Sequence, residues 1–309
     1  MKFWLNPEYK PGFELARLAT KHYSKSFYLS AKMLPPETRW ATYALYGFCR
    51  YADNLIDKPR NRSFTNLLQE VDHLTWEINQ AYETGSSEHP VIQPFIVVAK
   101  KYNIPAKYPL ELIRGVKMDI EKSRYENFDE LYLFAYRVAG VVGLMMTHVL
   151  GFKSDKAFEH AEKLGIAMQL TNILRDIQED KEMGRIYLPQ DELRSWGISD
   201  ADILNEKMCD KMHKFMQFQV KRAHHFYEEG NKGIHLLDRK SQFAIYAASK
   251  IYRGILRRIE ARDLNPYKGR VFVPQLRKIG ILFSEIIRTR FLPKNFNSQN
   301  FYFLLNKPI

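Results

Sequence analysis

Two stretches of the sequence carry pairs of carboxylates separated by one helical turn. Asp53 and Asp57 end the first stretch, and Asp176 and Asp180 end the second. Residues four apart lie on the same face of a helix, so each pair would project from one side. A single DxxxD pair arises easily by chance, so the residues that precede each pair carry more information.

Each pair closes a longer line of polar residues. Tyr46 and Arg50 precede the first pair, which places the four residues at offsets 0, 4, 7 and 11. Gln169 and Asn172 precede the second pair, at offsets 0, 3, 7 and 11. At 100° per residue each set lies within a stripe of roughly 40–80°. The residues between are largely apolar, so each polar line would be buried at a cost unless it is paired or binds a metal.

Carboxylates with other oxygen donors are typical ligands of Mg²⁺, which takes one or two carboxylates and leaves positions for substrate phosphate. Mn²⁺ has similar preferences. Two acidic helices facing each other could hold several Mg²⁺ ions between them, and these ions would bind a diphosphate and stabilise it as a leaving group. Arg50 and Arg175 would contact phosphate directly. The alternative is that the carboxylates are exposed and simply paired with Arg50, Arg175 and Lys181.

A further polar cluster consists of Ser24, Lys25 and Ser26, followed by an apolar run. Two hydroxyl groups and an ammonium group could open a helix onto phosphate. An ordinary helix N-cap produces the same pattern, so the cluster alone does not decide between the two.

The elements that position these residues are predicted to be helices. The chain has 309 residues, of which 45% are hydrophobic and 27% charged, which excludes wholesale disorder. Apolar residues recur every three to four positions in long proline-free segments, and strand signals are scarce. We expect an all-α fold of about eight to ten helices in one domain over residues 1–309. Its core would cover residues 22–280, followed by a basic and aromatic tail over residues 281–309.

One uncharged segment, residues 138–152, is shorter than the about 20 apolar residues that span a membrane, so we expect a buried helix there. The first residues contain no apolar run typical of a signal peptide. Two cysteines without a CxxC motif favour a reducing compartment, and we expect a cytoplasmic location.

The charge is concentrated towards the C-terminus. The chain has 47 Lys and Arg against 35 Asp and Glu, a net charge of +12. Residues 250–309 hold 13 basic and 3 acidic residues, a net of +10, together with many aromatic residues. This composition favours peripheral attachment to an anionic membrane surface, although a solvated helix face would look the same. No nucleic-acid-binding motif accompanies the charge, so nucleic acid is not expected as a partner.

These motifs resemble those of the squalene/phytoene synthase family, and the similarity runs from about residue 23 to residue 277. It rests on the following segments: YSKSF (23–27), YGFCRYADNLID (46–57), DELYLFAYRVAGVVGLM (129–145), QLTNILRDIQEDKEMGRIYLPQDEL (169–193), YRGILRRIE (252–260) and RVFV (270–273). The segment over 169–193 is the most specific, and together with residues 118–133 it is most similar to phytoene synthases. The resemblance implies a single isoprenoid-synthase helical bundle with a central cavity.

The resemblance also implies roles for individual residues. The implied metal ligands are Asp53, Asp57, Asn172, Asp176 and Asp180. The implied substrate-binding residues are Tyr23, Ser24, Lys25, Ser26, Tyr46, Arg50, Gln169, Arg175, Tyr252 and Arg270. The implied catalytic residues are Tyr46, Arg50, Asp53, Asp57, Tyr136, Asp176, Asp180 and Tyr187.

The implied activity is that of a prenyltransferase of isoprenoid biosynthesis. Two prenyl diphosphates condense head to head through a cyclopropyl diphosphate, and two geranylgeranyl diphosphates would give phytoene, a carotenoid precursor. Farnesyl diphosphate would instead give dehydrosqualene, or squalene with NADPH. No Gly-rich dinucleotide motif is present, so NADPH is not expected. Ala31 lies five residues beyond Ser26, and we predict that its small side chain leaves room for the longer substrate, unless it packs against a neighbouring helix.

Other classes of protein fit the sequence less well. A terpene cyclase or a head-to-tail synthase also uses paired acidic helices, but the RYAD and GRIYLP contexts argue against both. A di-iron bundle needs two ExxH motifs, and Glu70 with His73 supplies one. A non-catalytic helical protein at a membrane surface would use only the basic C-terminal region.

Overall fold

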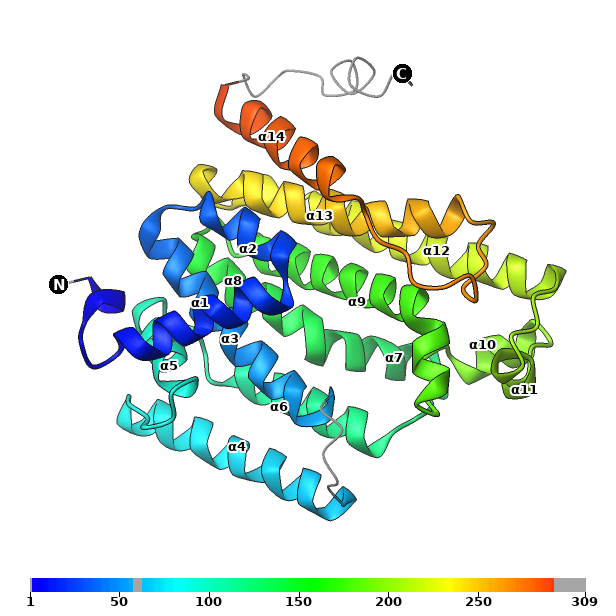
Figure 1. Cartoon of the computed structure of the whole chain (residues 1–309), viewed down its shortest axis with the longest axis horizontal. Coiled ribbons are helices and arrows are strands. Elements are labelled where there is room, and N and C mark those ends of the chain that lie inside the picture. Colours follow the sequence, from blue (N-terminus) through cyan, green and yellow to red (C-terminus); the bar gives the residue numbers. More distant parts are fainter. Residues whose placement is uncertain (1, 58–62, 292–309) are drawn as a thin grey trace.

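The computed structural model describes residues 2–57 and 63–291, and within these the side chains of residues 26, 56, 57 and 289–291 are outside the description. Fourteen α-helices occur in this part of the chain. No strand occurs among the described residues, where two isolated bridges join Arg124 to Ile186 and Phe152 to Leu237. The expected all-α fold is therefore confirmed (Figure 1).

The first half of the chain forms six helices. They are α1 (Lys10–Tyr23), α2 (Lys25–Lys32), α3 (Pro36–Asp57), α4 (Phe64–Thr84), α5 (Ile92–Lys101) and α6 (Lys107–Glu121). Helix α3 begins at a proline, whose fixed φ suits the first helical position. Helix α4 begins after Ser63, whose side chain accepts from the amide of Asn66, and ends at Gly85 with a φ of 80°.

The second half forms the remaining helices. They are α7 (Phe128–Ala135), α8 (Val141–Leu150), α9 (Lys156–Glu182), α10 (Gln190–Ser195), α11 (Asp200–Leu204), α12 (Asp210–Asn231), α13 (Arg239–Glu260) and α14 (Gln275–Phe291). The expected eight to ten helices were too few, because helices such as α10 and α11 have only six and five residues. Helices this short show too few turns for an apolar period to be recognised.

A π-helical segment, η2 (Tyr136–Gly140), joins α7 to α8 in one continuous rod. The rod, Phe128–Leu150, is long and apolar enough to span a membrane, with a mean hydropathy of 1.5, but 56% of that window is buried within the fold. It packs against α6 and α9. The expectation of a buried core helix for residues 138–152 therefore agrees with the packing of this segment.

Helix α9 runs through the middle of the bundle, with α8, α12 and α13 packed around it (Figure 1). Glycines allow the close approach of these helices. A Cβ atom at Gly165 would lie 2.3 Å from the carbonyl oxygen of Ala139 in η2, and one at Gly230 would lie 2.7 Å from the backbone of Leu164. Helix α3 packs against α1, α5 and α6 on the other side. The two acidic helices, α3 and α9, are thereby held within one bundle.

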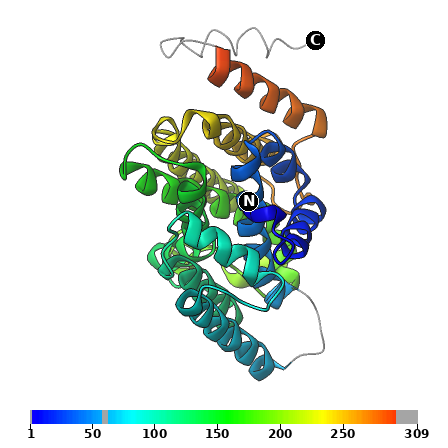
Figure 2. The same cartoon turned by 90° about the vertical axis from the view of Figure 1, so that its left-hand side faces the viewer.

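Helix α14 lies at one edge of the bundle and packs along α13 (Figures 1 and 2). The expected boundary between core and tail, at residues 280 and 281, falls inside this helix. Residues 292–309 of the expected tail lie outside the described residues.

Candidate active site

A cavity of about 320 Å³ lies among α3, α8, α9 and α13. Six residues singled out from the sequence line it: Ser24, Tyr46, Asp53, Gln169, Asn172 and Tyr252. They come from α3, α9, α13 and the start of α2, so only the tertiary fold brings them together. Asp53 of the first acidic pair and Asn172 of the second polar line therefore share one cavity.

The rest of the cavity wall is almost entirely apolar. It includes Ala157, Leu164 and Met168 along α9, and Val142 and Met146 along α8. From position 157 to position 172, α9 advances about 22 Å at 1.5 Å per residue. The polar residues of α9 lie at one end of this length, so the cavity suits an elongated apolar molecule with a polar head.

Two residues of the first polar line, Tyr46 and Arg50, contact aromatic rings. The ring of Tyr46 stacks on Phe27, with 5.1 Å between ring centroids, and burial raises the pKa of Tyr46 to about 12. Its hydroxyl therefore stays protonated at neutral pH and can donate a hydrogen bond. The guanidinium group of Arg50 lies 4.5 Å from the ring centroid of Tyr23, a cation–π distance.

Lys25, Ser26 and Asp57 are also predicted from the sequence to contact substrate or metal. Helix α2 begins at Lys25, after Ser24, as a helix opening onto the site requires, and Lys25 itself is exposed. The backbone of Ser26 and of Asp57 is helical, but their side chains lie outside the described part of the chain. Their expected contacts with substrate and metal stay predictions.

The second acidic pair carries two different carboxylates. Asp176 is held by guanidinium groups from two directions: Arg175 donates to it at 2.7 and 2.5 Å, and Arg270 lies 3.1 Å away. Arg270 also lies 3.0 Å from Glu179. Burial, together with the carboxylates of Asp176 and Asp119, raises the pKa of Asp180 to about 7. The neighbouring carboxylates and burial therefore raise the pKa of Asp180 by more than nearby Arg185 lowers it.

The structure adds two residues that the sequence reasoning did not single out, Asp119 of α6 and Arg185. The hydroxyl of Tyr187 donates to Asp119 at 2.5 Å, and Arg185 lies 3.4 Å from the same carboxylate. Tyr187 and Asp180 line one small pocket together with Arg185. Asp119 belongs to residues 118–133, a segment that supported the resemblance to phytoene synthases. That segment could have indicated Asp119 as a site residue, but no residue was predicted from it.

Two residues predicted to act at the substrate, Tyr136 and Ala31, do not line the cavity. Tyr136 is not among the residues that line the cavity, and its pKa is raised by burial and by the carboxylates of Glu162 and Glu111. Ala31 is 2% exposed within the hydrophobic core and also does not line the cavity. The packing of Ala31 matches the alternative that its methyl group fills space between helices.

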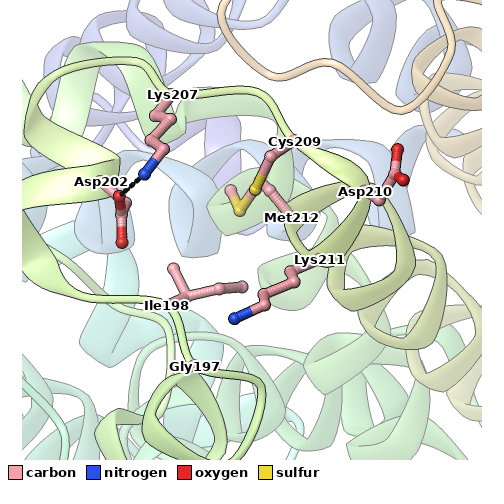
Figure 3. A pocket seen from close by; sticks show the side chains of 8 residues that line it. All are labelled: Gly197, Ile198, Asp202, Lys207, Cys209, Asp210, Lys211 and Met212. Atoms are coloured by element: carbon pink, nitrogen blue, oxygen red, sulfur yellow. Dashed lines mark ion pairs between the residues drawn. The ribbon is translucent and has the colours of Figure 1, made fainter.

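A second pocket, of about 510 Å³, is lined by residues of α11, the start of α12 and the segments that precede these two helices (Figure 3). Lys207 is paired with Asp202 at 3.0 Å, and Lys211 and Cys209 lie on the same wall. None of the residues proposed from the sequence lines this pocket. The apolar cavity with a polar end is therefore the stronger candidate for the site.

Comparison with known proteins shows the family to which the chain belongs. Residues 20–277 match the squalene/phytoene synthase family. The chain belongs to this family. It is 40% identical over 273 residues to phytoene synthase 1 of Arabidopsis thaliana, covering 84% of this chain and 62% of that protein. It is 36% identical over 280 residues to the 15-cis-phytoene synthase of Synechocystis, covering 86% and 82% of the two chains.

Solved structures of this family have the same fold. A dehydrosqualene synthase in complex with a ligand superposes with a TM-score of 0.82 at 29% identity, covering 90% of this chain and 96% of the other. A squalene synthase from Alicyclobacillus acidocaldarius gives a TM-score of 0.78 at 24% identity, which shows the fold alone. The chain spans less than two thirds of the length of the plant phytoene synthase from Arabidopsis, at 62%.

The residues of this family member fit a divalent cation. Among the described residues, no three carboxylate, histidine or cysteine side chains form a metal-binding group on their own. Mg²⁺ does not need such a cage, because it is held by one or two carboxylates together with substrate phosphates. The Oδ1 atom of Asn172 is buried without a hydrogen-bond partner and shares the cavity with Asp53. Both side chains therefore supply the oxygen donors that a hard cation prefers.

Proposed function

We propose that the protein is a phytoene synthase, which condenses two molecules of geranylgeranyl diphosphate head to head. The observation that carries this is the largely apolar cavity whose wall includes the polar side chains of Asp53, Asn172 and Tyr46. The curated relatives described above are phytoene synthases, which supports the longer of the two prenyl substrates.

In the proposed first half-reaction, the C1–O bond of one prenyl diphosphate breaks and diphosphate leaves. The C2=C3 π electrons of the second molecule form a bond to the resulting allylic carbon, and loss of a proton closes a cyclopropane. In the second half-reaction, this cyclopropyl diphosphate loses its own diphosphate, the ring rearranges, and a proton leaves to give a triene. No hydride is consumed, so this route does not require NADPH.

Residues of the chain bind and orient the two substrates. Arg50, Arg175 and Arg270 supply positive charge at the diphosphate end, and the protonated hydroxyl of Tyr46 can donate a hydrogen bond there. The apolar walls from α8 and α9 hold the prenyl chains and exclude water from the cationic intermediates. Mg²⁺, bound by Asp53 and Asn172 with Asp57, Asp176 and Asp180, would stabilise the negative charge of the leaving diphosphate.

One observation favours a second candidate, condensation of two farnesyl diphosphates to dehydrosqualene. The solved structure with a TM-score of 0.82 is a dehydrosqualene synthase. To decide between the two, the purified protein is incubated with Mg²⁺ and either the C15 or the C20 diphosphate. The molecular mass of the extracted hydrocarbon is then measured. A C40 triene from the C20 substrate supports phytoene synthase, and a C30 product alone refutes it. Failure to release diphosphate from either substrate would favour a non-catalytic helical protein.

We also propose that the protein works as a peripheral protein at an anionic membrane surface on the cytoplasmic side. The support is the net charge of +10 in residues 250–309 and the insolubility in water of the proposed hydrocarbon product. Vesicle binding that does not weaken with salt would remove the electrostatic part of this proposal.

A further inference from the structure

Helix α14 buries Leu282 and packs Ile281 and Ile286 against the core, and it also presents a second apolar stripe to the solvent. Leu276 is 84% exposed, Phe283 is 64% exposed, and Ile279 between them is also exposed. At 100° per residue these three side chains fall within about 60° of one another, so they form one stripe. Phe272, just before the helix, is exposed as well. Single exposed apolar residues are normal, but four that gather on one short segment form a patch.

The side of α14 that meets the bundle also contains charged residues. Glu285 is fully buried, at 0% exposure, and accepts hydrogen bonds from Lys250 of α13 and from Arg288. The guanidinium group of Arg288 lies 3.8 Å from the ring centroid of Tyr246 on α13. A surface helix usually buries its apolar side and exposes its charges. Here α14 is held on the bundle by a buried ion-pair network and by buried Leu282, while the further apolar stripe of Leu276, Ile279 and Phe283 faces outward.

We infer that the outer face of α14, made of Leu276, Ile279 and Phe283, docks on the surface of an anionic lipid bilayer together with Phe272, which precedes the helix. A helix with exposed apolar side chains and neighbouring cations lies in the plane of a membrane interface. Arg277 is exposed beside the stripe, and residues 250–309 carry the net charge of +10 that an anionic surface attracts. Charge complementarity therefore selects an anionic bilayer over a neutral protein surface.

The outer face of α14 is connected through the preceding chain segment to the second acidic pair. Arg270, two residues before Phe272, contacts Asp176 and Glu179 of the second acidic pair. Val271 and Val273 are buried on either side of Phe272. This segment therefore links the diphosphate end of the site directly to the outer face. The inference rests on the proposed function for one point, that the substrates and product are lipids which a bilayer can supply and receive.

The first test uses co-sedimentation with phosphatidylcholine vesicles, with and without phosphatidylglycerol. The full chain should bind the anionic vesicles, and the variant with Leu276→Ser and Phe283→Ser should bind at least about tenfold more weakly, because two exposed apolar side chains are lost. The matched control is Leu15→Ser with Leu18→Ser, two exposed leucines of α1. Equal binding by the α14 variant and the full chain, or an equal loss in the α1 control, would overturn the inference.

The second test distinguishes a bilayer from other occupants of the same face. In a Cys209→Ser background, Phe283→Cys carries an environment-sensitive fluorophore, since Cys49 is buried. Its emission should shift to shorter wavelength only when anionic vesicles are added. A shifted emission before addition, or one that follows protein concentration, would show that the chain itself or a second copy covers the face, and the inference would fail.

A third measurement separates this inference from the proposed function. Diphosphate release in detergent micelles should be the same for the full chain and for the α14 variant, because neither Leu276 nor Phe283 lines the cavity. If the full chain releases no diphosphate, the proposed function fails while the vesicle result stands. If the full chain is active but the α14 variant binds vesicles normally, the docking face is wrong and the function stands.

Discussion

At the scale of single residues, Asp53 and Asp176 have different surroundings but are expected to serve one leaving group. Asp53 lines the cavity, and Asp176 lies between Arg175 and Arg270. We predict that Asp53→Asn and Asp176→Asn fold normally, since the change is nearly isosteric, and lower the rate of diphosphate release by at least about 10²-fold. Asp155→Asn, at an exposed aspartate, is the control. Turnover close to that of the unchanged protein in either variant would contradict the site assignment.

His148 gives a prediction about pH. Its ring lies among Tyr108, Phe152 and Phe158, and burial lowers its pKa. The unfolded chain therefore binds the proton more tightly than the folded chain. The free energy of unfolding should fall as pH drops below the ordinary histidine pKa of about 6.5. We predict that His148→Phe flattens this dependence between about pH 7 and pH 5, measured by urea unfolding. An unchanged slope would show that other groups dominate the acid sensitivity.

At the scale of elements, the packing of α9 against η2 leaves no space for a side chain at position 165. A Cβ atom there would lie 2.3 Å from a backbone oxygen, which cannot move away as a flexible side chain could. We predict that Gly165→Ala lowers the free energy of unfolding by about 1–3 kcal/mol. Gly280→Ala is the matched control, because nothing lies within 4 Å of its Cβ position in α14. That variant should stabilise the protein by up to about 1 kcal/mol, and a similar loss in both would refute the packing argument.

Helix α2 gives a prediction about substrate length. Ala31 is buried and does not line the cavity, so a phenylalanine there must displace its neighbours. If the displaced groups enter the cavity, Ala31→Phe should favour the C15 over the C20 diphosphate when both are supplied together. The measurement is the ratio of the two hydrocarbon products. An unchanged preference for the C20 substrate would show that Ala31 only packs between helices, and the proposed function would be unaffected.

At the scale of the whole molecule, α14 is joined to the bundle mainly through α13 and the buried Glu285. Removing one partner of a buried ion pair costs about 3–5 kcal/mol, because the remaining charges lose their compensation. We predict that Glu285→Ala increases hydrogen exchange in α14 and leaves the exchange of α9 unchanged. Glu121→Ala, at an exposed glutamate, is the control. Faster exchange throughout the chain would show global destabilisation instead of release of one helix.

The sequence by itself determined the helical class, the two acidic pairs and the family, because these depend on local period and on specific motifs. It did not reveal Asp119 and Arg185, whose partner Tyr187 is distant in the chain from Asp119. The roles expected at the substrate for Tyr136 and Ala31 stay predictions, and neither residue is among those that line the cavity. Spacing along one helix defines a face, but which neighbour covers that face depends on how the helices pack. For the same reason, only the tertiary structure showed that α14 turns its apolar stripe outward.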